Sequence, residues 1–254
     1  MPLTLTLVLF GVLLLAQSAA LAAAARGLWR AVPAWSIYLC LVTAHLVVGF
    51  AGTATKREYP LVLLYFEPLI ILGQIVFTFE TGIKMSGFKF GTGSPESRLL
   101  IWLIPLVPAA IVMPIEIGFI HDALVGWNNH ESDSLGLVYN VRRFLSLTLL
   151  FVLLAIPVAV RLGKKAARPA ALLHHNVVTA YIACGAAGYL GKLYSTGNLD
   201  FLLTSFFFVV GPMACFLTWS WKMWMYHPAD FEAFEVQSAN DTSTSFDRGA
   251  LLNL

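Results

Sequence analysis

Glu67 and Gln74 lie in an apolar stretch, YFEPLIILGQIVFTFETG, that is long enough to cross a membrane. Positions seven apart on a helix return to nearly the same face, so these two side chains are predicted to share a stripe. Thr78 and Thr81 continue the stripe. Because a charge in hydrocarbon is expensive, the stripe should face other helices, and Pro68 predicts a kink at this level.

Other helices are predicted to bring polar side chains to the depth of Glu67: His45, Glu116, Asn140, Arg142 and Arg143. We expect Glu67 to pair with Arg142 or Arg143, because a buried carboxylate needs a partner. Adjacent residues lie about 100° apart on a helix, so the other arginine is expected to reach the outer interface. Glu80 points away from the stripe, and we expect it to contribute little to stability.

This polar layer has two interpretations. In the first, the ion pairs only lock helices together. In the second, they line an outward-facing pocket that binds a ligand below the loop 121–136. That loop is rich in histidine and acidic residues, but it lacks metal-ligand spacing, so we expect neither a metal nor a cofactor. Nucleotide-binding motifs and nucleophile triads are also absent, and no catalytic residue is assigned.

Composition indicates a polytopic membrane protein. The chain has 58% hydrophobic and 12% charged residues, with a mean hydropathy of +0.76. Soluble domains are usually about half apolar and a quarter charged. The net charge is only +2, which gives no indication of a nucleic-acid partner. The expected partners are membrane lipids, with other membrane subunits as a further alternative.

The predicted fold is an all-α bundle of seven transmembrane helices. Seven windows have the length that a membrane crossing needs: 3–24, 32–52, 60–82, 99–120, 137–160, 173–193 and 201–224. They form one domain over residues 1–226, followed by a polar cytoplasmic tail over 227–254. The first window is interpreted as a retained helix. A cleaved secretory signal is the alternative, and it would leave six helices.

Charge asymmetry orients the predicted bundle. One set of loops and helix ends carries nine basic residues: Arg26, Arg30, Lys84, Lys89, Arg98, Arg161, Lys164, Lys165 and Arg168. The opposite set carries only Lys56 and Arg57. Basic short loops stay in the cytoplasm, so the N-terminus is predicted outside and the tail inside.

Two further patterns concern the window 173–193. His174 and His175 are expected to anchor its cytoplasmic end at the membrane interface. Gly185 and Gly188, in CGAAGYLGK, are small enough to let another helix approach closely. The window is therefore predicted to pack tightly against a neighbour through its glycines.

Two motifs, YPLVLLYFEP and YNVRRFLSL, carry a loose resemblance to uncharacterised bacterial seven-helix integral membrane proteins. The resemblance implies a multi-pass protein of the bacterial inner membrane and supplies no activity. Membrane terpene cyclases are similar in size, but their Asn-x-x-Trp-Glu stretch has no counterpart here. A retinal-binding lysine, receptor motifs and paired haem histidines are also missing.

Three functions follow from these patterns. The first is a non-catalytic membrane component, either a sensor or an accessory subunit. The second is binding or transport of a small solute or ion, and the third is a lipid- or isoprenoid-processing enzyme that uses the carboxylates as acid and base. The absence of a catalytic motif favours the first, and the small-molecule ligand is not specified by the sequence.

Overall fold

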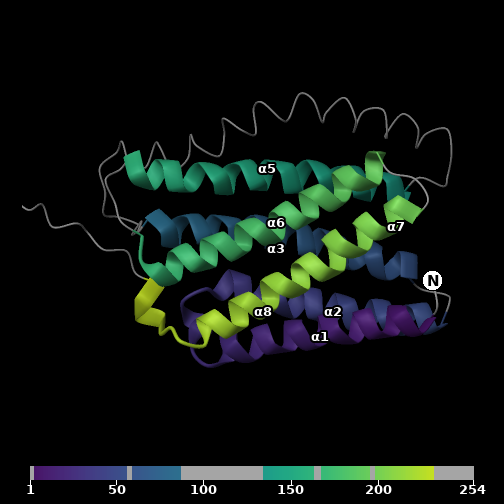
Figure 1. The fold of residues 1–254 in the computed structure, drawn as a ribbon, viewed down its shortest axis with the longest axis horizontal. Helices are drawn as coiled ribbons and strands as arrows, with labels where there is room; N and C mark the ends of the chain where they lie inside the picture. The colour runs from purple at the N-terminus through teal and green to yellow at the C-terminus, as the bar shows by residue number, and fades with distance from the viewer. Residues whose placement is uncertain (1–2, 56–58, 87–133, 163–166, 195–197, 232–254) are drawn as a thin grey trace, which may run out of the picture.

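A computed structural model describes residues 3–55, 59–86, 134–162, 167–194 and 198–231 of the chain (Figure 1). This part of the protein is helical throughout. Its helices are α1 (Leu3–Ala25), α2 (Pro33–Thr55), α3 (Tyr59–Ser86), α5 (Ser134–Leu162), α6 (Pro169–Tyr194), α7 (Asn198–Ser205) and α8 (Gly211–Met223). Single turns are formed by η1 (Leu28–Arg30), η2 (Phe206–Val210) and η3 (Pro228–Phe231).

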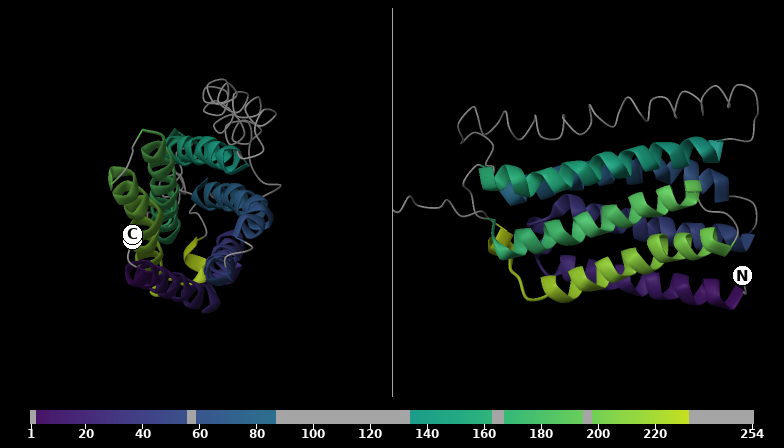
Figure 2. Two further views of the ribbon diagram at one scale, coloured as in Figure 1. Left: turned by 90° about the vertical axis from the view of Figure 1, so that its right-hand side faces the viewer. Right: turned by 45° about the horizontal axis from the view of Figure 1, so that its top comes forward.

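The helices form a closed ring. Going round it, α1 contacts α2, α2 contacts α3, α3 contacts α5, α5 contacts α6, α6 contacts α8, and α8 returns to α1. Helix α3 also contacts α6 across the ring. Figure 2 shows this ring along the axis of the bundle and shows the long helices lying side by side. Helices that are far apart in the sequence, such as α1 and α8, are therefore neighbours.

Four of the described helical segments are long and apolar enough to cross a membrane: Val8–Ala25, Phe66–Met85, Val141–Arg161 and Leu202–Met223. Large apolar side chains, such as Leu15, Leu154 and Trp221, are exposed on their outer faces. Outward apolar surface of this kind suits contact with lipid and supports a multi-pass membrane protein. The predicted helix 99–120 lies outside the described residues, so the count of seven stays a prediction.

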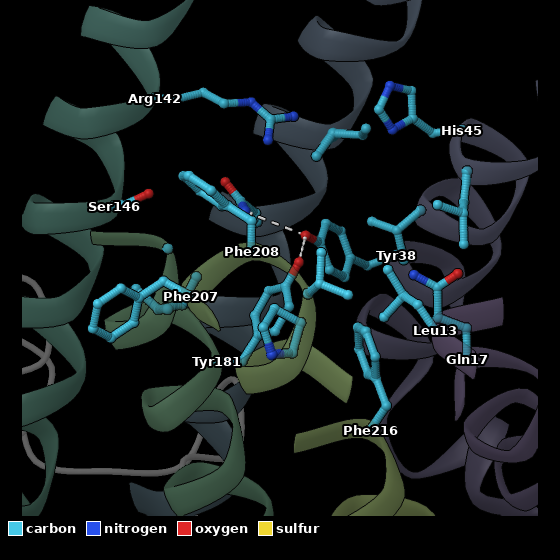
Figure 3. A pocket seen from close by; sticks show the side chains of 18 of the residues that line it. Leu13, Gln17, Tyr38, His45, Arg142, Ser146, Tyr181, Phe207, Phe208 and Phe216 are labelled. Atoms are coloured by element: carbon cyan, nitrogen blue, oxygen red, sulfur yellow. Dashed lines mark hydrogen bonds between the residues drawn. The ribbon is translucent and has the colours of Figure 1, made fainter. Parts of the chain in front are cut away.

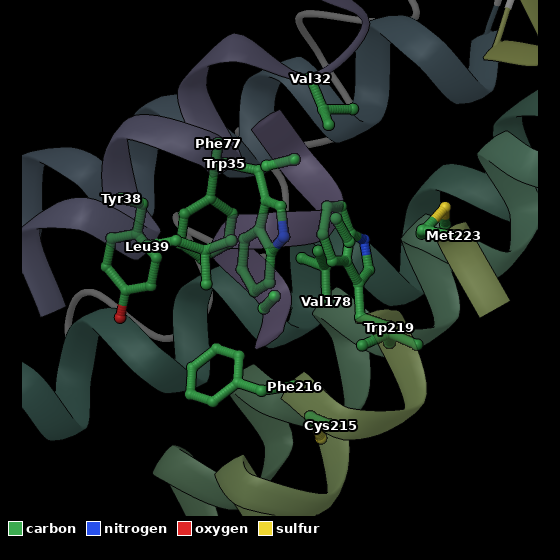
Figure 4. Close-up of a cluster of buried hydrophobic side chains, with 14 of the residues drawn as sticks. Val32, Trp35, Tyr38, Leu39, Phe77, Val178, Cys215, Phe216, Trp219 and Met223 are labelled. Atoms are coloured by element: carbon green, nitrogen blue, oxygen red, sulfur yellow. The ribbon is translucent and has the colours of Figure 1, made fainter. Parts of the chain in front are cut away.

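A cluster of buried aromatic side chains lies inside the bundle; we call it the aromatic cluster (Figure 4). Trp35 lies at its centre and is fully buried. The Trp35 ring centroid lies 5.1 Å from that of Phe77 in an edge-to-face arrangement, and 6.0 Å from that of Trp219. Phe216 and Tyr181 complete the contacts. Such ring pairs add to the stability that their burial already provides.

His174 belongs to this cluster, so the prediction that it anchors the interface is wrong. Trp219 Nε1 donates to His174 Nδ1 at 3.0 Å, which places the ring proton on Nε2. His174 Nε2 then lies 3.3 Å from Thr81 Oγ1, and that hydroxyl donates to the Phe77 carbonyl at 2.7 Å. The imidazole is buried because each of its nitrogens has a partner inside the bundle.

His175 is also buried, contrary to the same prediction. Its Nε2 lies 2.9 Å from the carbonyl oxygen of Leu153 on α5. The contact joins α6 to α5 through a backbone carbonyl that sits within a helix. Both histidines therefore turn toward neighbouring helices and not toward lipid.

Glu80 caps the start of α2, which corrects the expectation that it contributes little. Its two carboxylate oxygens accept hydrogen bonds from the backbone N–H groups of Ala34 and Trp35, each at 3.0 Å. Helix α2 begins at Pro33, so these N–H groups have no partner within the helix. A carboxylate at a helix N-terminus satisfies such donors and interacts favourably with the helix dipole.

The described chain ends on the aromatic cluster. The turn η3 is closed by Asp230, whose carboxylate accepts from the His227 backbone N–H at 2.7 Å. Phe231 follows and is buried, with its ring centroid 6.1 Å from that of His174. The first residues of the predicted tail thus pack on the bundle, and residues 232–254 lie outside the described part.

Candidate functional site

The polar stripe on α3 faces the interior of the ring, as the sequence predicted. Glu67, Gln74, Thr78 and Thr81 are all buried, whereas Leu69 and Leu72 between them are exposed. Helix α3 stays continuous through Pro68. The stripe therefore places its carboxylate, amide and hydroxyl groups where α5, α6 and α2 can contact them.

The predicted ion pair of Glu67 is formed with Arg142 on α5. Arg142 Nε donates to a carboxylate oxygen of Glu67, and Arg142 Nη1 donates to the Tyr189 hydroxyl at 3.0 Å. Three helices are joined by this contact. Arg143 is buried rather than at an exposed interface, so the prediction that it extends to the outer interface is wrong.

A second set of polar contacts lies deeper in the ring. Gln74 Nε2 donates to the Tyr38 hydroxyl at 3.2 Å, and this hydroxyl is hydrogen-bonded to that of Tyr181. Figure 3 shows the two phenol groups meeting at the centre of the bundle, with dashed lines along the chain of bonds. This chain connects α3, α2 and α6.

Between these two sets of contacts lies a cavity of about 350 Å³, which we call the pocket (Figure 3). Its volume is within the range of small-molecule sites. Helices α1, α2, α3, α5, α6 and α8 all contribute to its wall, together with η2. Apolar side chains such as Leu13, Val42 and Ile70 form much of the surface, and a few polar groups interrupt them.

Three buried polar atoms at the pocket have no hydrogen-bond partner in the part of the chain that the structure describes. They are Gln17 Oε1 on α1, His45 Nε2 on α2 and Arg142 Nη2 on α5. A buried polar group that lacks a partner costs free energy comparable to a lost hydrogen bond or more. Three such groups, from three different helices, therefore lie around one cavity.

The turn η2 forms part of the wall of the pocket. Phe206–Val210 adopt a π-helical turn between α7 and α8, and Phe207, Phe208 and Val209 line the pocket. Turns of this type are rare and often occur at functional sites, because the extra residue changes the direction of the side chains that follow. The apolar sequence FFFVV gave no indication of it.

The glycine-rich face of α6 packs closely, as predicted, and it packs against η2. A Cβ atom at Gly188 would lie 2.8 Å from Cζ of Phe208, which is closer than van der Waals contact permits. At Gly185 the nearest atom would be Ser146 Oγ at 3.6 Å, an ordinary contact. The missing side chain at Gly188 thus leaves room for Phe208 beside the pocket.

The structure brings together only some of the predicted site residues. His45, Glu67, Gln74 and Arg142 line the pocket. Asn140 lies in α5, where its side chain is not described, and Glu116 and the loop 121–136 lie outside the described residues.

Sequence reasoning missed several lining residues: Gln17, Tyr38, Tyr181, Tyr189 and Phe208. Gln17 offered one signal, since an amide in the alanine-rich first helix needs a partner in a membrane. The tyrosines offered none, because aromatic residues are common throughout the chain.

Groups of three or more metal-ligating side chains do not occur among the described residues. Around the pocket, the carboxylate and guanidinium are bound to each other, and the remaining polar groups are amide, imidazole and hydroxyl. The arrangement can therefore hold a small molecule by hydrogen bonds and apolar contact. Comparison with known proteins finds no match to a family model, to a curated protein or to a solved structure.

Proposed function

We propose that this protein is a non-catalytic, multi-pass membrane protein that binds a small molecule in the pocket, and that it acts as a sensor or as an accessory subunit of a membrane complex. It lies in the cell membrane with seven helices, the window 99–120 supplying one of them. Its N-terminus is outside and its tail is in the cytoplasm. The excess of basic residues in one set of loops supports this orientation.

The observation that carries the proposal is the set of unpaired polar atoms around one pocket. Gln17 Oε1, His45 Nε2 and Arg142 Nη2 come from three different helices and lie at the same cavity. An ion pair that only joins helices has no need of such a cavity. A ligand that supplies the missing hydrogen bonds explains both the space and the unpaired atoms.

The pocket supports binding better than catalysis. Glu67 is the candidate acid or base, yet its carboxylate is bound by Arg142. A carboxylate that is bound by a guanidinium has to give up this contact before it can take a proton from a substrate, and breaking a buried ion pair is costly. The lipid-processing alternative therefore has less support than ligand binding.

Native mass spectrometry of the protein in mild detergent tests the proposal. Wild type is expected to carry a bound small molecule. Ser146→Phe, which places a ring in the pocket, is expected to lose it. Ser146 is buried at the pocket, whereas Leu154 on the same helix is exposed, so Leu154→Phe is the matched control and should retain the molecule.

Two results would contradict the proposal. One is wild type without any bound molecule, even after purification from cell membranes in the mildest detergent that keeps it folded. The other is equal retention of the molecule by wild type and by folded Ser146→Phe. The second result would place the bound molecule elsewhere on the surface.

A further inference from the structure

We infer that the ligand of the pocket is an uncharged, elongated molecule with a hydrogen-bonding group at each end and an apolar middle. The inference rests on the proposed function and adds to it the chemical class of the ligand. It follows from three properties of the pocket: its balanced charge, its two separated polar layers and the apolar wall between them.

The charge of the pocket is balanced before any ligand enters. Glu67 and Arg142 are the acidic and the basic side chain among its described lining residues, and they form an ion pair with each other. An ionised ligand would therefore bring an unpaired charge into the interior of a membrane protein. Such a charge is expensive unless a partner accompanies it, so the pocket favours a neutral molecule.

The first polar layer requires an acceptor. Arg142 uses Nε for Glu67 and Nη1 for Tyr189, which leaves Nη2 as an unpaired donor. His45 Nε2 lies at the same pocket and can donate or accept, according to its tautomer. Figure 3 shows Arg142 and His45 on the same side of the pocket. A hydroxyl or carbonyl oxygen placed there would accept from Arg142 and bond to His45.

The second polar layer requires a donor. Gln17 Oε1 is an unpaired acceptor, and Figure 3 shows Gln17 on the side of the pocket opposite Arg142. Tyr38 and Tyr181, whose hydroxyls already bond to each other, also lie on this side of the pocket and belong to the second layer. A ligand hydroxyl or N–H group beside Gln17 would supply the missing bond.

The two layers set the length of the ligand. Seven residues separate His45 from Tyr38 along α2, and seven separate Glu67 from Gln74 along α3. At 1.5 Å per residue, the pocket extends about 10 Å from one layer to the other. Leu13, Val42 and Phe208 line the space between them. The middle of the ligand should therefore be apolar and about as long as two linked six-membered rings.

Three matched probes test the inference in detergent-solubilised protein: biphenyl-4,4′-diol, 4-phenylphenol and 4′-hydroxybiphenyl-4-carboxylate. The first has a hydroxyl at each end, the second lacks one hydroxyl, and the third has a charged group at one end. Their apparent Kd values are obtained from the rise in Tm with probe concentration. We expect the diol to bind about tenfold more tightly than 4-phenylphenol, which is the worth of one well-made hydrogen bond. It should also bind at least about tenfold more tightly than the carboxylate, which brings a charge without a partner.

Gln17→Leu is the variant that isolates the second layer. It should bring the Kd values of the diol and of 4-phenylphenol to within about threefold of each other, because the second hydroxyl then lacks its acceptor. Leu15→Met changes an exposed side chain on the same helix and should leave the tenfold preference intact. Ser146→Phe should weaken all three probes.

Several outcomes would overturn the inference and still leave the proposed function standing. Tighter binding of the carboxylate than of the diol would show that the pocket prefers an anion. Equal Kd values of wild type for the diol and for 4-phenylphenol would show that the second hydroxyl makes no hydrogen bond in the pocket. A wild type that responds to none of the probes would exclude this ligand class, and the co-purified molecule would then decide the proposed function separately.

Discussion

The pocket and the aromatic cluster are built on the same helices, but they differ in how many of their buried polar atoms have hydrogen-bond partners. In the cluster, His174 has a partner for each nitrogen, and Glu80 nearby has one for each carboxylate oxygen. In the pocket, one side-chain atom each of Arg142, His45 and Gln17 has no hydrogen-bond partner in the described part of the chain. Trp35 Nε1 in the cluster also has no partner among the described residues, but Trp35 is enclosed by rings and does not line the pocket.

This difference indicates that the aromatic cluster contributes mainly to stability and the pocket mainly to the proposed binding. Close ring contacts and the hydrogen bonds of His174 and Glu80 stabilise one arrangement of helices. The pocket, in contrast, places unpaired polar atoms beside a space that side chains do not fill. Such a space adds no contacts that stabilise the fold, and a ligand can occupy it under the proposed function. Changes in the cluster should therefore alter stability, while changes at the unpaired polar atoms of the pocket should alter binding more than stability.

The largest effect on stability is expected for Trp35→Ala. The side chain is fully buried and contacts rings from α3, α6 and α8. Its loss leaves a large cavity in a packed region, which should lower the free energy of unfolding by about 5 kcal/mol. Trp221→Ala, at a site that is 71% exposed, is the control and should cost far less. Similar losses in Tm for both variants would show that the cluster does not hold the bundle together.

The next effect concerns the ion pair beside the pocket. Glu67→Gln should lower the free energy of unfolding by about 3 kcal/mol, because it leaves the Arg142 guanidinium without its counter-charge. A double-mutant cycle with Arg142→Gln measures the coupling between the two side chains and should account for most of this loss.

The control for this double-mutant cycle is a second cycle that uses Arg143, the neighbouring arginine. The Glu67 carboxylate is bound by Arg142, so Glu67→Gln combined with Arg143→Gln should show much weaker coupling. Coupling near zero for Arg142 would mean that the pair contributes nothing to stability. Equal coupling for both arginines would mean that neither contact is specific.

The sequence predicted the parts of this arrangement that follow from one helix and its environment. Glu67, Gln74 and the two threonines share a face because the helix period is fixed, and a charge within a membrane must turn toward a partner. The pairing of Glu67 with one of the two arginines followed from their shared depth. Which arginine would be chosen did not, because that depends on the rotation of α5 against α3.

The errors come from contacts between segments that the sequence does not bring together. Glu80 is far from α2 in the sequence, but it caps α2 because the start of α2 lies beside the end of α3. His174 and His175 follow a basic loop, which suggested the interface, yet their partners are on α8, α3 and α5. The π-helical turn depends on how Phe208 fits against Gly188, and no propensity encodes that fit.

The smallest effect on stability is expected for Gly188→Ala, and it would sharpen the comparison most. The added methyl group meets the far edge of the Phe208 ring, and this ring can move toward the pocket. We therefore expect a loss of only about 1 kcal/mol, at the low end for overpacking, together with weaker probe binding as the ring occupies the space of the ligand. Gly185→Ala is the same change one turn earlier on α6, where the nearest contact is 3.6 Å away, and it should be neutral or slightly stabilising. Tm and the Kd of biphenyl-4,4′-diol are measured for both variants. A large loss of stability with unchanged binding in Gly188→Ala would contradict this expectation. It would show that Phe208 is packed as tightly as the aromatic cluster and does not move into the pocket.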